Sequence, residues 1–140
     1  MLLASCTETN AVRVPAPDLA AGCYAPTYDA KSVSNFSALA AEIHVPPLRL
    51  IDQRIVADNP WKTVEAVDPA DPIPSATYGW LRINHLLVIL FLDGDTKSVF
   101  MDLRDSKIGL IGTIYSIGGP RGRTPEFPIE LIRKPCDSFN

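Results

Sequence analysis

Thirteen prolines are spread over a chain of 140 residues, and they limit the folds open to it more than any other feature. Proline has no backbone donor and breaks the interior of a helix, so the prolines argue against long helices. Hydrophobic residues make up 46% and charged residues 21%, which is the balance of a globular chain with a core. The length suits one domain. We therefore expect a single domain built from short segments joined by rigid loops.

Most of these segments have the composition of β-strands. β-branched and aromatic residues are concentrated in short runs bounded by turn residues. These runs predict strands at 22–28, 48–56, 61–67, 77–83, 86–92, about 98–103, 108–117 and 127–134. Val99, Met101 and Leu103 alternate with other residues, so we expect that strand to bury one face. One short amphipathic helix is predicted at 34–42 from apolar residues at three- and four-residue spacing.

The turns indicate how the strands are connected. Asn84-His85 and Asp93-Gly94-Asp95 are short breaks of the kind that reverse the chain in a hairpin. Hairpin-linked strands at close spacing are typical of an all-β barrel or sandwich. We therefore predict a mainly β fold of about eight antiparallel strands forming a small closed, lipocalin-like barrel, with a β-sandwich as the alternative.

The first six residues contain a possible lipidation site. Leu3-Ala4-Ser5-Cys6 matches the bacterial lipobox, in which small residues precede the cysteine that receives lipid. The basic and apolar parts of a signal peptide are missing, so either the chain begins inside the leader or the match is fortuitous. We expect residues 1–21 to be a truncated lipoprotein signal and a flexible tether, 22–137 the β domain, and 138–140 a tail.

Setting Cys6 aside leaves Cys23 and Cys136 as an even pair. In an exported chain such a pair ordinarily forms a disulfide, whereas in a cytosolic chain both would be free thiols. The two cysteines fall at the first and last predicted strands. Because these strands are neighbours in an up-and-down barrel, a bond between them favours closure over an open sheet. An eight-stranded barrel is either filled by its side chains or just able to hold one small ligand.

Charge and hydropathy exclude several kinds of partner. The net charge of −3 and the pI near 5.3 provide no basic face for nucleic acid. No apolar run approaches the roughly 20 residues needed to span a bilayer as a helix, so membrane contact is expected through a lipid anchor only. No cofactor motif is present. Neither the two histidines nor the cysteines have the spacing of metal ligands, so no metal is expected.

Several short motifs resemble those of one loosely defined group of proteins. They are Cys23-Tyr24, Pro46-Pro47, Trp80, Leu110-Ile111-Gly112 and Arg133-Lys134-Pro135-Cys136. In this order they resemble uncharacterised small bacterial lipoproteins with a Cys-Tyr start, a Trp-led β-meander and a terminal Pro-Cys. The chain departs from that pattern at Asn84-His85, where the group often has Gly-Asp. The resemblance implies an exported β domain and carries no activity with it.

Two sets of residues are candidates for binding. Arg121 and Arg123 lie in a glycine-rich segment, where exposed amides and two guanidiniums could hold an anion; the alternative is a hairpin loop with solvated arginines. Aromatic residues in the strands are either core or the lining of a pocket, and a barrel interior can be both. The candidate lining residues are Tyr78, Trp80, Phe91 and Phe100.

No arrangement of nucleophile, base and acid is recognisable, so we expect a protein that is not an enzyme. The favoured function is a noncatalytic lipoprotein barrel that binds a small apolar or amphipathic molecule. The alternative is a structural or protein-interaction module, such as an inhibitor. The expected location is the bacterial cell envelope, facing the periplasm or the surface, with a secreted soluble protein as the alternative. Ligand identity and oligomeric state are left open.

Overall fold

A computed structural model describes residues 18–28, 45–70, 77–92, 97–118, 122–123 and 126–139. The side chains of Tyr78 and Phe91 are outside this description, although both residues are placed in strands. Four predicted features also lie outside the described residues. They are the Cys6 lipobox, the helix at 34–42, the Asp93-Gly94-Asp95 turn and Arg121.

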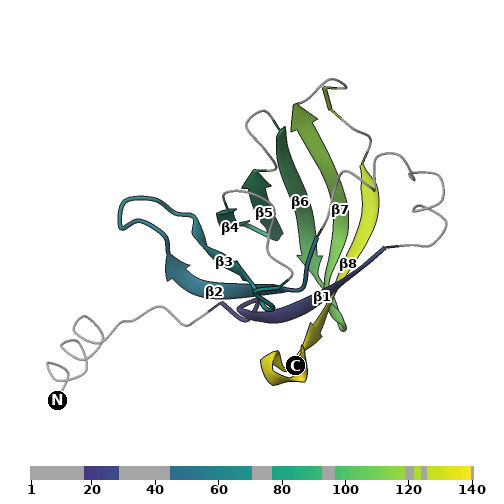
Figure 1. Ribbon diagram of the computed structural model, residues 1–140. Helices are drawn as coiled ribbons and strands as arrows, with labels where there is room; N and C mark the ends of the chain where they lie inside the picture. Colours follow the sequence, from purple (N-terminus) through teal and green to yellow (C-terminus); the bar gives the residue numbers. More distant parts are fainter. Residues whose placement is uncertain are drawn as a thin grey trace, which may run out of the picture.

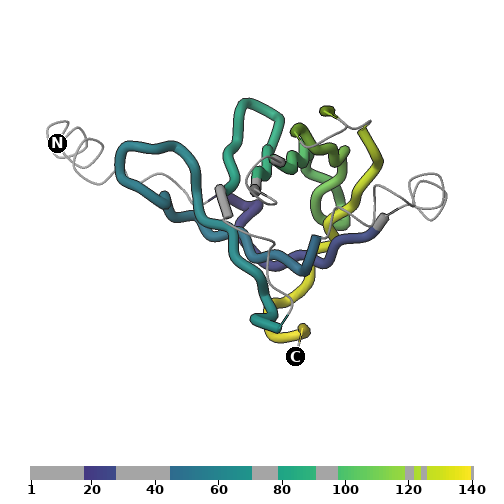
Figure 2. The backbone as a smooth tube through the Cα atoms, turned by 45° about the horizontal axis from the view of Figure 1, so that its top comes forward, coloured from purple at the N-terminus to yellow at the C-terminus, as the bar shows by residue number. Residues whose placement is uncertain are grey.

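Eight antiparallel strands close into one barrel, in which each strand pairs with its sequence neighbours and the last pairs with the first. Figures 1 and 2 show the chain wrapping around in sequence order. The strands are β1 (Gly22–Tyr28), β2 (Leu48–Arg54), β3 (Lys62–Ala66), β4 (Thr77–Ile83), β5 (Leu86–Leu92), β6 (Lys97–Asp105), β7 (Gly109–Gly118) and β8 (Phe127–Lys134). A short 3-10 helix, η1 (Cys136–Phe139), follows. The predicted closed β-barrel is confirmed.

Several predicted strand boundaries agree with the structure to the residue, and the others differ slightly. Thr77–Ile83, Leu86–Leu92 and Phe127–Lys134 are as expected. β2 ends at Arg54 rather than two residues later, because the chain turns at Ile55. Asn84 has a φ of 56°, a left-handed conformation that asparagine tolerates in the predicted turn between β4 and β5.

The strand alternation builds one hydrophobic core inside the barrel. Val99, Met101 and Leu103 are fully buried on β6, which confirms the buried face predicted for that strand. Trp80 on β4 is also fully buried, and it belongs to the same cluster. Other members come from every remaining strand of the barrel, and they include Tyr24, Leu50, Val64, Ile89, Ile114 and Leu131. The described interior is therefore occupied by the chain's own side chains.

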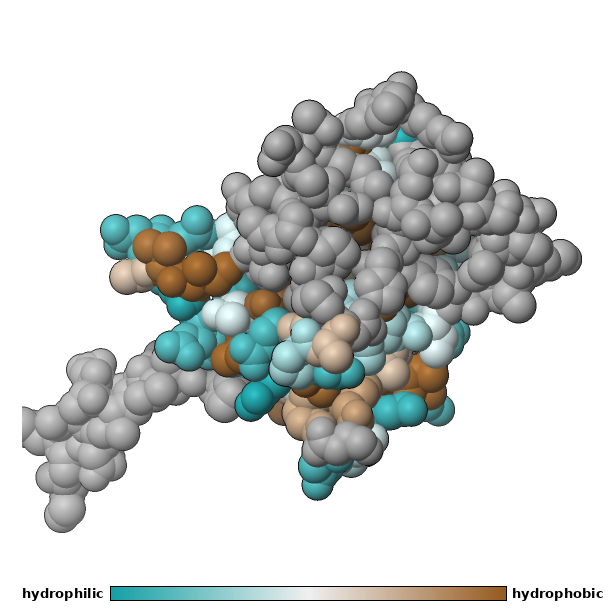
Figure 3. Space-filling view, in the orientation of Figure 1, coloured by the Kyte–Doolittle hydropathy of each residue, from teal (hydrophilic) through white to brown (hydrophobic). Residues whose placement is uncertain are grey.

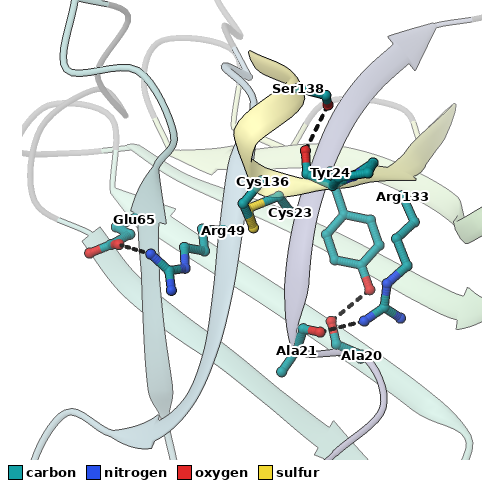
Figure 4. The surroundings of a disulfide bond; sticks show 10 residues. Ala20, Ala21, Cys23, Tyr24, Arg49, Glu65, Arg133, Cys136 and Ser138 are labelled. Carbon is teal, nitrogen blue, oxygen red and sulfur yellow. Dashed lines mark hydrogen bonds and ion pairs between the residues drawn. A yellow bond between two sulfur atoms is a disulfide. The ribbon is translucent and has the colours of Figure 1, made fainter. Parts of the chain in front are cut away.

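The predicted Cys23–Cys136 disulfide is present, with the two Cα atoms 5.2 Å apart (Figure 4). Cys23 is buried in β1, but Cys136 lies in η1, just after β8 rather than within it. Cys23 pairs with Lys134 in the β1–β8 register. Only Pro135 separates Lys134 from Cys136, so Cys136 lies within reach of Cys23. The bond therefore joins β1 to the short helix that directly follows β8, at the place where β1 and β8 close the barrel.

The strand directions define two ends of the barrel. At one end lie the turns β2–β3, β4–β5 and β6–β7, together with the end of β8 and the start of β1. Residues 18–21 precede β1 and lie across this end. We call these residues the plug, and we call the end of the barrel where they lie the plugged end. Among the described residues no helix is long and apolar enough to cross a membrane.

Candidate functional site

Charged side chains surround the mouth of the barrel at the plugged end. On three strands they continue the inward-facing positions beyond the core: Arg82 follows Trp80, Asp105 follows Leu103 and Arg133 follows Leu131 on a period of two. On the β2–β3 hairpin, Asp52 and Lys62 occupy the corresponding places. Regular alternation therefore places polar groups where the apolar interior meets solvent.

The plug is tied to this mouth through Asp18. Its carboxylate accepts two hydrogen bonds from the Arg82 guanidinium, at 2.7 and 3.0 Å. The same carboxylate accepts one from the backbone N–H of Ala20, at 2.9 Å, and the N–H of Asp18 donates to the Asp52 carboxylate at 2.6 Å. Charge-assisted, two-point contacts of this kind give geometric specificity. They join residues far apart in sequence into one network.

Arg133 and Tyr24 hold the rest of the plug through its backbone. The Arg133 guanidinium donates to the carbonyl oxygens of Leu19 and Ala21, and the Tyr24 hydroxyl donates to that of Ala20 at 2.6 Å. Figure 4 shows the Tyr24 and Arg133 side chains converging on the plug beside the disulfide. The guanidinium also lies 5.7 Å from the centroid of the Tyr24 ring. The plug is therefore fixed at each of its residues.

Hydrogen bonds in this network lower the pKa values of two carboxyl groups, those of Asp18 and Asp52. The hydrogen bonds from Arg82 are the main cause of the lowered pKa of Asp18, and the hydrogen bond from Lys62 lowers the pKa of Asp52. The hydrogen bond to Asp18 in turn raises the pKa of Arg82. Burial raises the pKa of the Tyr24 hydroxyl. At neutral pH the carboxylates are therefore ionised and paired, while Tyr24 stays protonated and can donate to the plug.

A pocket of about 370 Å³ opens beside the plug. It is lined by Leu19, Tyr24, Asp105, Ser106, Lys107, Gly109 and Arg133. The Ser106 hydroxyl is buried and has no hydrogen-bond partner among the described residues. A buried polar group without a partner is costly, and this hydroxyl is the one buried side-chain nitrogen or oxygen of the described residues that lacks a partner, so a bound group could satisfy it.

A second, larger hollow lies on the outer wall, over β6, β7 and β8, with a volume of about 580 Å³. It is lined by Arg104, Asp105, Ile111, Gly112, Thr113, Pro128, Ile129 and Glu130. We call it the outer groove. Ile111 is 42% exposed there, and Pro128, also exposed, lies opposite Thr113 in the β7–β8 register. The groove combines an apolar floor with one basic residue, Arg104, and two acidic residues, Asp105 and Glu130.

Of the predicted aromatic lining, the two residues whose side chains are described, Trp80 and Phe100, do not share a site. Trp80 is fully buried, donates its indole N–H to the carbonyl oxygen of Ile51 at 3.0 Å, and has the Lys62 ammonium 4.8 Å from its ring centroid. Phe100 lies between the inward-facing Val99 and Met101, so it is on the outer face. There it stacks on Tyr115, with ring centroids 5.3 Å apart. This differs from the prediction that Phe100 lines the interior, and the alternation along its strand accounts for the difference.

Arg123 makes contacts within the protein. Its guanidinium lies 4.3 Å from the Tyr115 ring centroid and 4.0 Å from the Glu126 carboxylate. With Arg121 outside the description, the predicted pair of guanidiniums is not seen together. The anion site proposed for Arg121 and Arg123 therefore stays a prediction.

The residues of the mouth were missed by sequence reasoning. Asp18 falls in the segment expected to be a tether, and Arg82 and Arg133 lie in predicted strands but were not among the candidates for binding. The available signal was positional, because Arg82 is two residues beyond Trp80 and so shares its face. Within the described part of the chain, no cluster of His, Cys, Asp or Glu is arranged to hold a metal ion.

No protein-family model, curated protein or solved structure matches this chain.

Proposed function

We propose that this chain is a noncatalytic, lipid-anchored β-barrel of the bacterial cell envelope that binds another envelope protein on its outer wall. The occupied interior is the observation that carries the proposal. Trp80, Met101 and Leu103 are fully shielded from solvent and belong to one core cluster. Protein interiors are close-packed, so an apolar guest would have to displace these side chains. Binding on the outside requires no such change.

The outer groove supports the choice of surface. Exposed Ile111 and Pro128 provide apolar contact area, and Arg104 and Glu130 offer charges of both signs at its sides. An apolar centre with polar surroundings is the usual anatomy of a protein interface. The favoured partner is a protein whose apolar side chain enters the groove between an acidic and a basic group of its own.

Export is supported by two features that agree. Disulfides persist in oxidising compartments, and the Cys23–Cys136 bond is compatible with such a location. The lipobox match at Cys6 supplies a means of anchoring. We expect radiolabelled palmitate to be incorporated into the chain when it is expressed behind a complete lipoprotein leader. The Cys6→Ser variant should incorporate none, and labelling of that variant would contradict lipidation at Cys6.

The interface is tested by photo-crosslinking in living cells. Replacing Ile111 with p-benzoylphenylalanine should give a discrete adduct of higher mass with one envelope protein. The control places the same residue at Ile117, which is equally exposed, at 41%, but outside the groove. Adding Glu130→Arg should abolish the adduct at position 111. Equal adducts from both positions, or none from position 111, would refute the proposed interface.

A second candidate function is favoured by Ser106 alone. Its unpartnered hydroxyl lies in the pocket beside the plug, which Lys107 and Arg133 also line. A small molecule with an anionic or polar head therefore fits there better than inside the barrel. Native mass spectrometry of protein purified from envelopes should then show a retained small molecule. The Ser106→Ala variant should lose it. If the parent protein and the Ser106→Ala variant both showed only the mass of the polypeptide, this second candidate function would be ruled out.

A further inference from the structure

Exposed aliphatic side chains gather at the plugged end of the barrel. Of the eight large hydrophobic residues exposed in the described chain, six belong to the plug or to the turns and strand ends there. They are Leu19, Ile55, Val56, Ile83, Leu86 and Ile108, which we call the apolar rim. Leu19 is the most exposed, at 86%. Figure 3 shows one part of the rim as a hydrophobic group at the far end of the β2–β3 hairpin.

The topology explains why these residues share one end. In an up-and-down barrel alternate connections fall at the same end, so the turns β2–β3, β4–β5 and β6–β7 all lie there. Rim residues lie in the β2–β3 and β6–β7 turns and at the two strand ends that flank the β4–β5 turn, and the plug adds Leu19. Turns that only reverse the chain are usually polar, so aliphatic residues in or beside all three turns at this end, and in the plug, call for a partner.

The path of the chain indicates what that partner is. Asp18 is held at the plugged end by Arg82, so the segment that carries Cys6 joins the barrel at this end. Asp18 follows Cys6 by twelve residues. A chain of that length reaches at most about 40 Å when fully extended. If Cys6 carries lipid, the plugged end is therefore the part of the barrel nearest the membrane.

The electrostatics of this end are compatible with an apolar boundary. Arg82 is paired with Asp18 and Asp105, and Lys62 is paired with Asp52. Paired charges lose less on approach to a medium of low polarity than isolated ones. Lys107 stands next to Ile108 on the β6–β7 turn, where its long side chain can keep its ammonium in the headgroup region.

We propose that the apolar rim is a membrane-docking surface that rests on the outer part of a lipid bilayer. The aliphatic tips would enter the boundary between headgroups and acyl chains, while the strands and the disulfide stay outside it. This inference extends the proposed function, because it orients the anchored barrel and leaves the outer groove facing sideways, where a protein can reach it. It depends on the proposed lipid anchor only for the choice of partner.

The test uses the full-length chain with Cys6→Ser, so that any binding to membrane comes from the barrel itself. Cosedimentation with vesicles of phosphatidylethanolamine and phosphatidylglycerol should show binding that persists in 0.5 M salt. Leu19→Asp and Ile108→Asp should each lower the coefficient for partitioning of the protein onto the vesicles at least tenfold. The matched control is Ile117→Asp, because Ile117 is 41% exposed and Ile108 is 45% exposed. Ile108 directly precedes β7, whereas Ile117 lies near the other end of that strand. We expect the control to bind within twofold of the parent.

A second readout locates the contact without a destabilising substitution. The chain has two tryptophans, Trp61 beside the β2–β3 turn and Trp80 buried in the core. Brominated lipids should quench the fluorescence of Trp61 and leave that of Trp80 unchanged. A Trp61→Phe variant, which fluoresces from Trp80 alone, separates the two signals.

Three outcomes would overturn the proposal. They are no sedimentation with vesicles, equal losses in Ile108→Asp and Ile117→Asp, and self-association through the rim in place of lipid binding. None of them alters crosslinking at Ile111, so failure of this inference is distinguishable from failure of the proposed interface.

Discussion

Asp18 and Arg82 are separated by 64 residues in the sequence, yet they make the most specific polar contact at the plugged end. The side chain of Asp18 is 15% exposed and that of Arg82 is 24% exposed. Partial burial strengthens a charge-assisted hydrogen bond relative to one in open water, and it makes the loss of either partner costly. The plug is therefore held by groups whose ionisation matters to stability.

The first prediction concerns the pH dependence of that contact. Because Arg82 lowers the pKa of Asp18 below its usual 3.8, Asp18 contributes stability above that pH, and the contribution is lost as pH falls through the lowered folded-state pKa. Asp18→Asn should cost about 1–3 kcal/mol at pH 7, a difference that shrinks below about pH 4. Urea unfolding at pH 7, 5 and 3 measures it. Asp58→Asn, at the exposed β2–β3 turn, is the control, and a pH-independent difference would contradict the assignment.

A second prediction at this scale concerns Gly79. Its φ of 151° and the closeness of the Lys62 carbonyl oxygen and the Ile55 Cδ1 atom leave no room for a Cβ. Gly79→Ala should lower the free energy of unfolding by about 2–4 kcal/mol, from backbone strain and overpacking together. Gly122 also has a positive φ, 67°, but nothing within 4 Å, so Gly122→Ala should cost about 1 kcal/mol. Equal costs in chemical denaturation would show that the close contact relaxes freely.

The elements of the barrel are not joined with equal strength. β6 and β7 pair continuously from Lys97–Gly118 to Asp105–Leu110. Over the described residues, β3 and β4 share a single residue pair, Lys62–Trp80. The β2–β3 hairpin, which extends away from the other strands in Figure 2, is therefore joined to β4 mainly through Trp80, Lys62 and Ile55. We call this junction, which has the shortest ladder among the described strands, the β3–β4 seam.

Hydrogen exchange should reveal that seam. Backbone amides bonded only across a short ladder open by local fluctuation, whereas those in a continuous ladder open with the whole fold. We expect β3 amides to exchange at least tenfold faster than those of β6 and β7 under native conditions, as measured by NMR or mass spectrometry. Trp80→Phe should widen the difference by removing the indole hydrogen bond to Ile51. Equal protection of β3 and β6 would argue against a weak seam.

At the scale of the whole molecule, the disulfide clasps the strands that close the barrel. Cys23 and Cys136 are 113 residues apart in sequence. A bond across so long a loop should stabilise the fold by about 4–5 kcal/mol through the entropy of the unfolded chain. We expect the Cys23→Ser/Cys136→Ser variant to lose about that free energy in urea unfolding, on a Cys6→Ser background that prevents mispairing. Reduction of the parent with dithiothreitol should give a similar loss, and a loss below about 1 kcal/mol would contradict the entropic account.

Much of the fold was predictable because its signals are local. The β4 and β5 boundaries follow from two β-rich runs and the Asn84-His85 break between them, since turn residues act on their immediate neighbours. The buried face of β6 follows from Val99, Met101 and Leu103, because strand alternation has a period of two. The disulfide follows from counting cysteines once Cys6 is set aside.

The candidate sites were less predictable, because they depend on contacts between distant residues. Phe100 and Trp80 are both aromatic residues of the kind that line pockets, but the register places them on opposite faces of the sheet. Asp18 gave no local signal, since its role exists only when Arg82 faces it across the mouth. The outer groove depends in the same way on how β6, β7 and β8 twist past one another.

The sequence by itself determined the strands, their order and the cysteine pair, because proline positions, alternation and turn chemistry act over a few residues. Only the tertiary structure decided what the closed barrel contains and presents. Closure brought Asp18, Arg82 and Asp105 together, filled the interior with side chains around Trp80, and collected the aliphatic turns at one end. These outcomes depend on three-dimensional packing and register, in which residues with no common local pattern become neighbours.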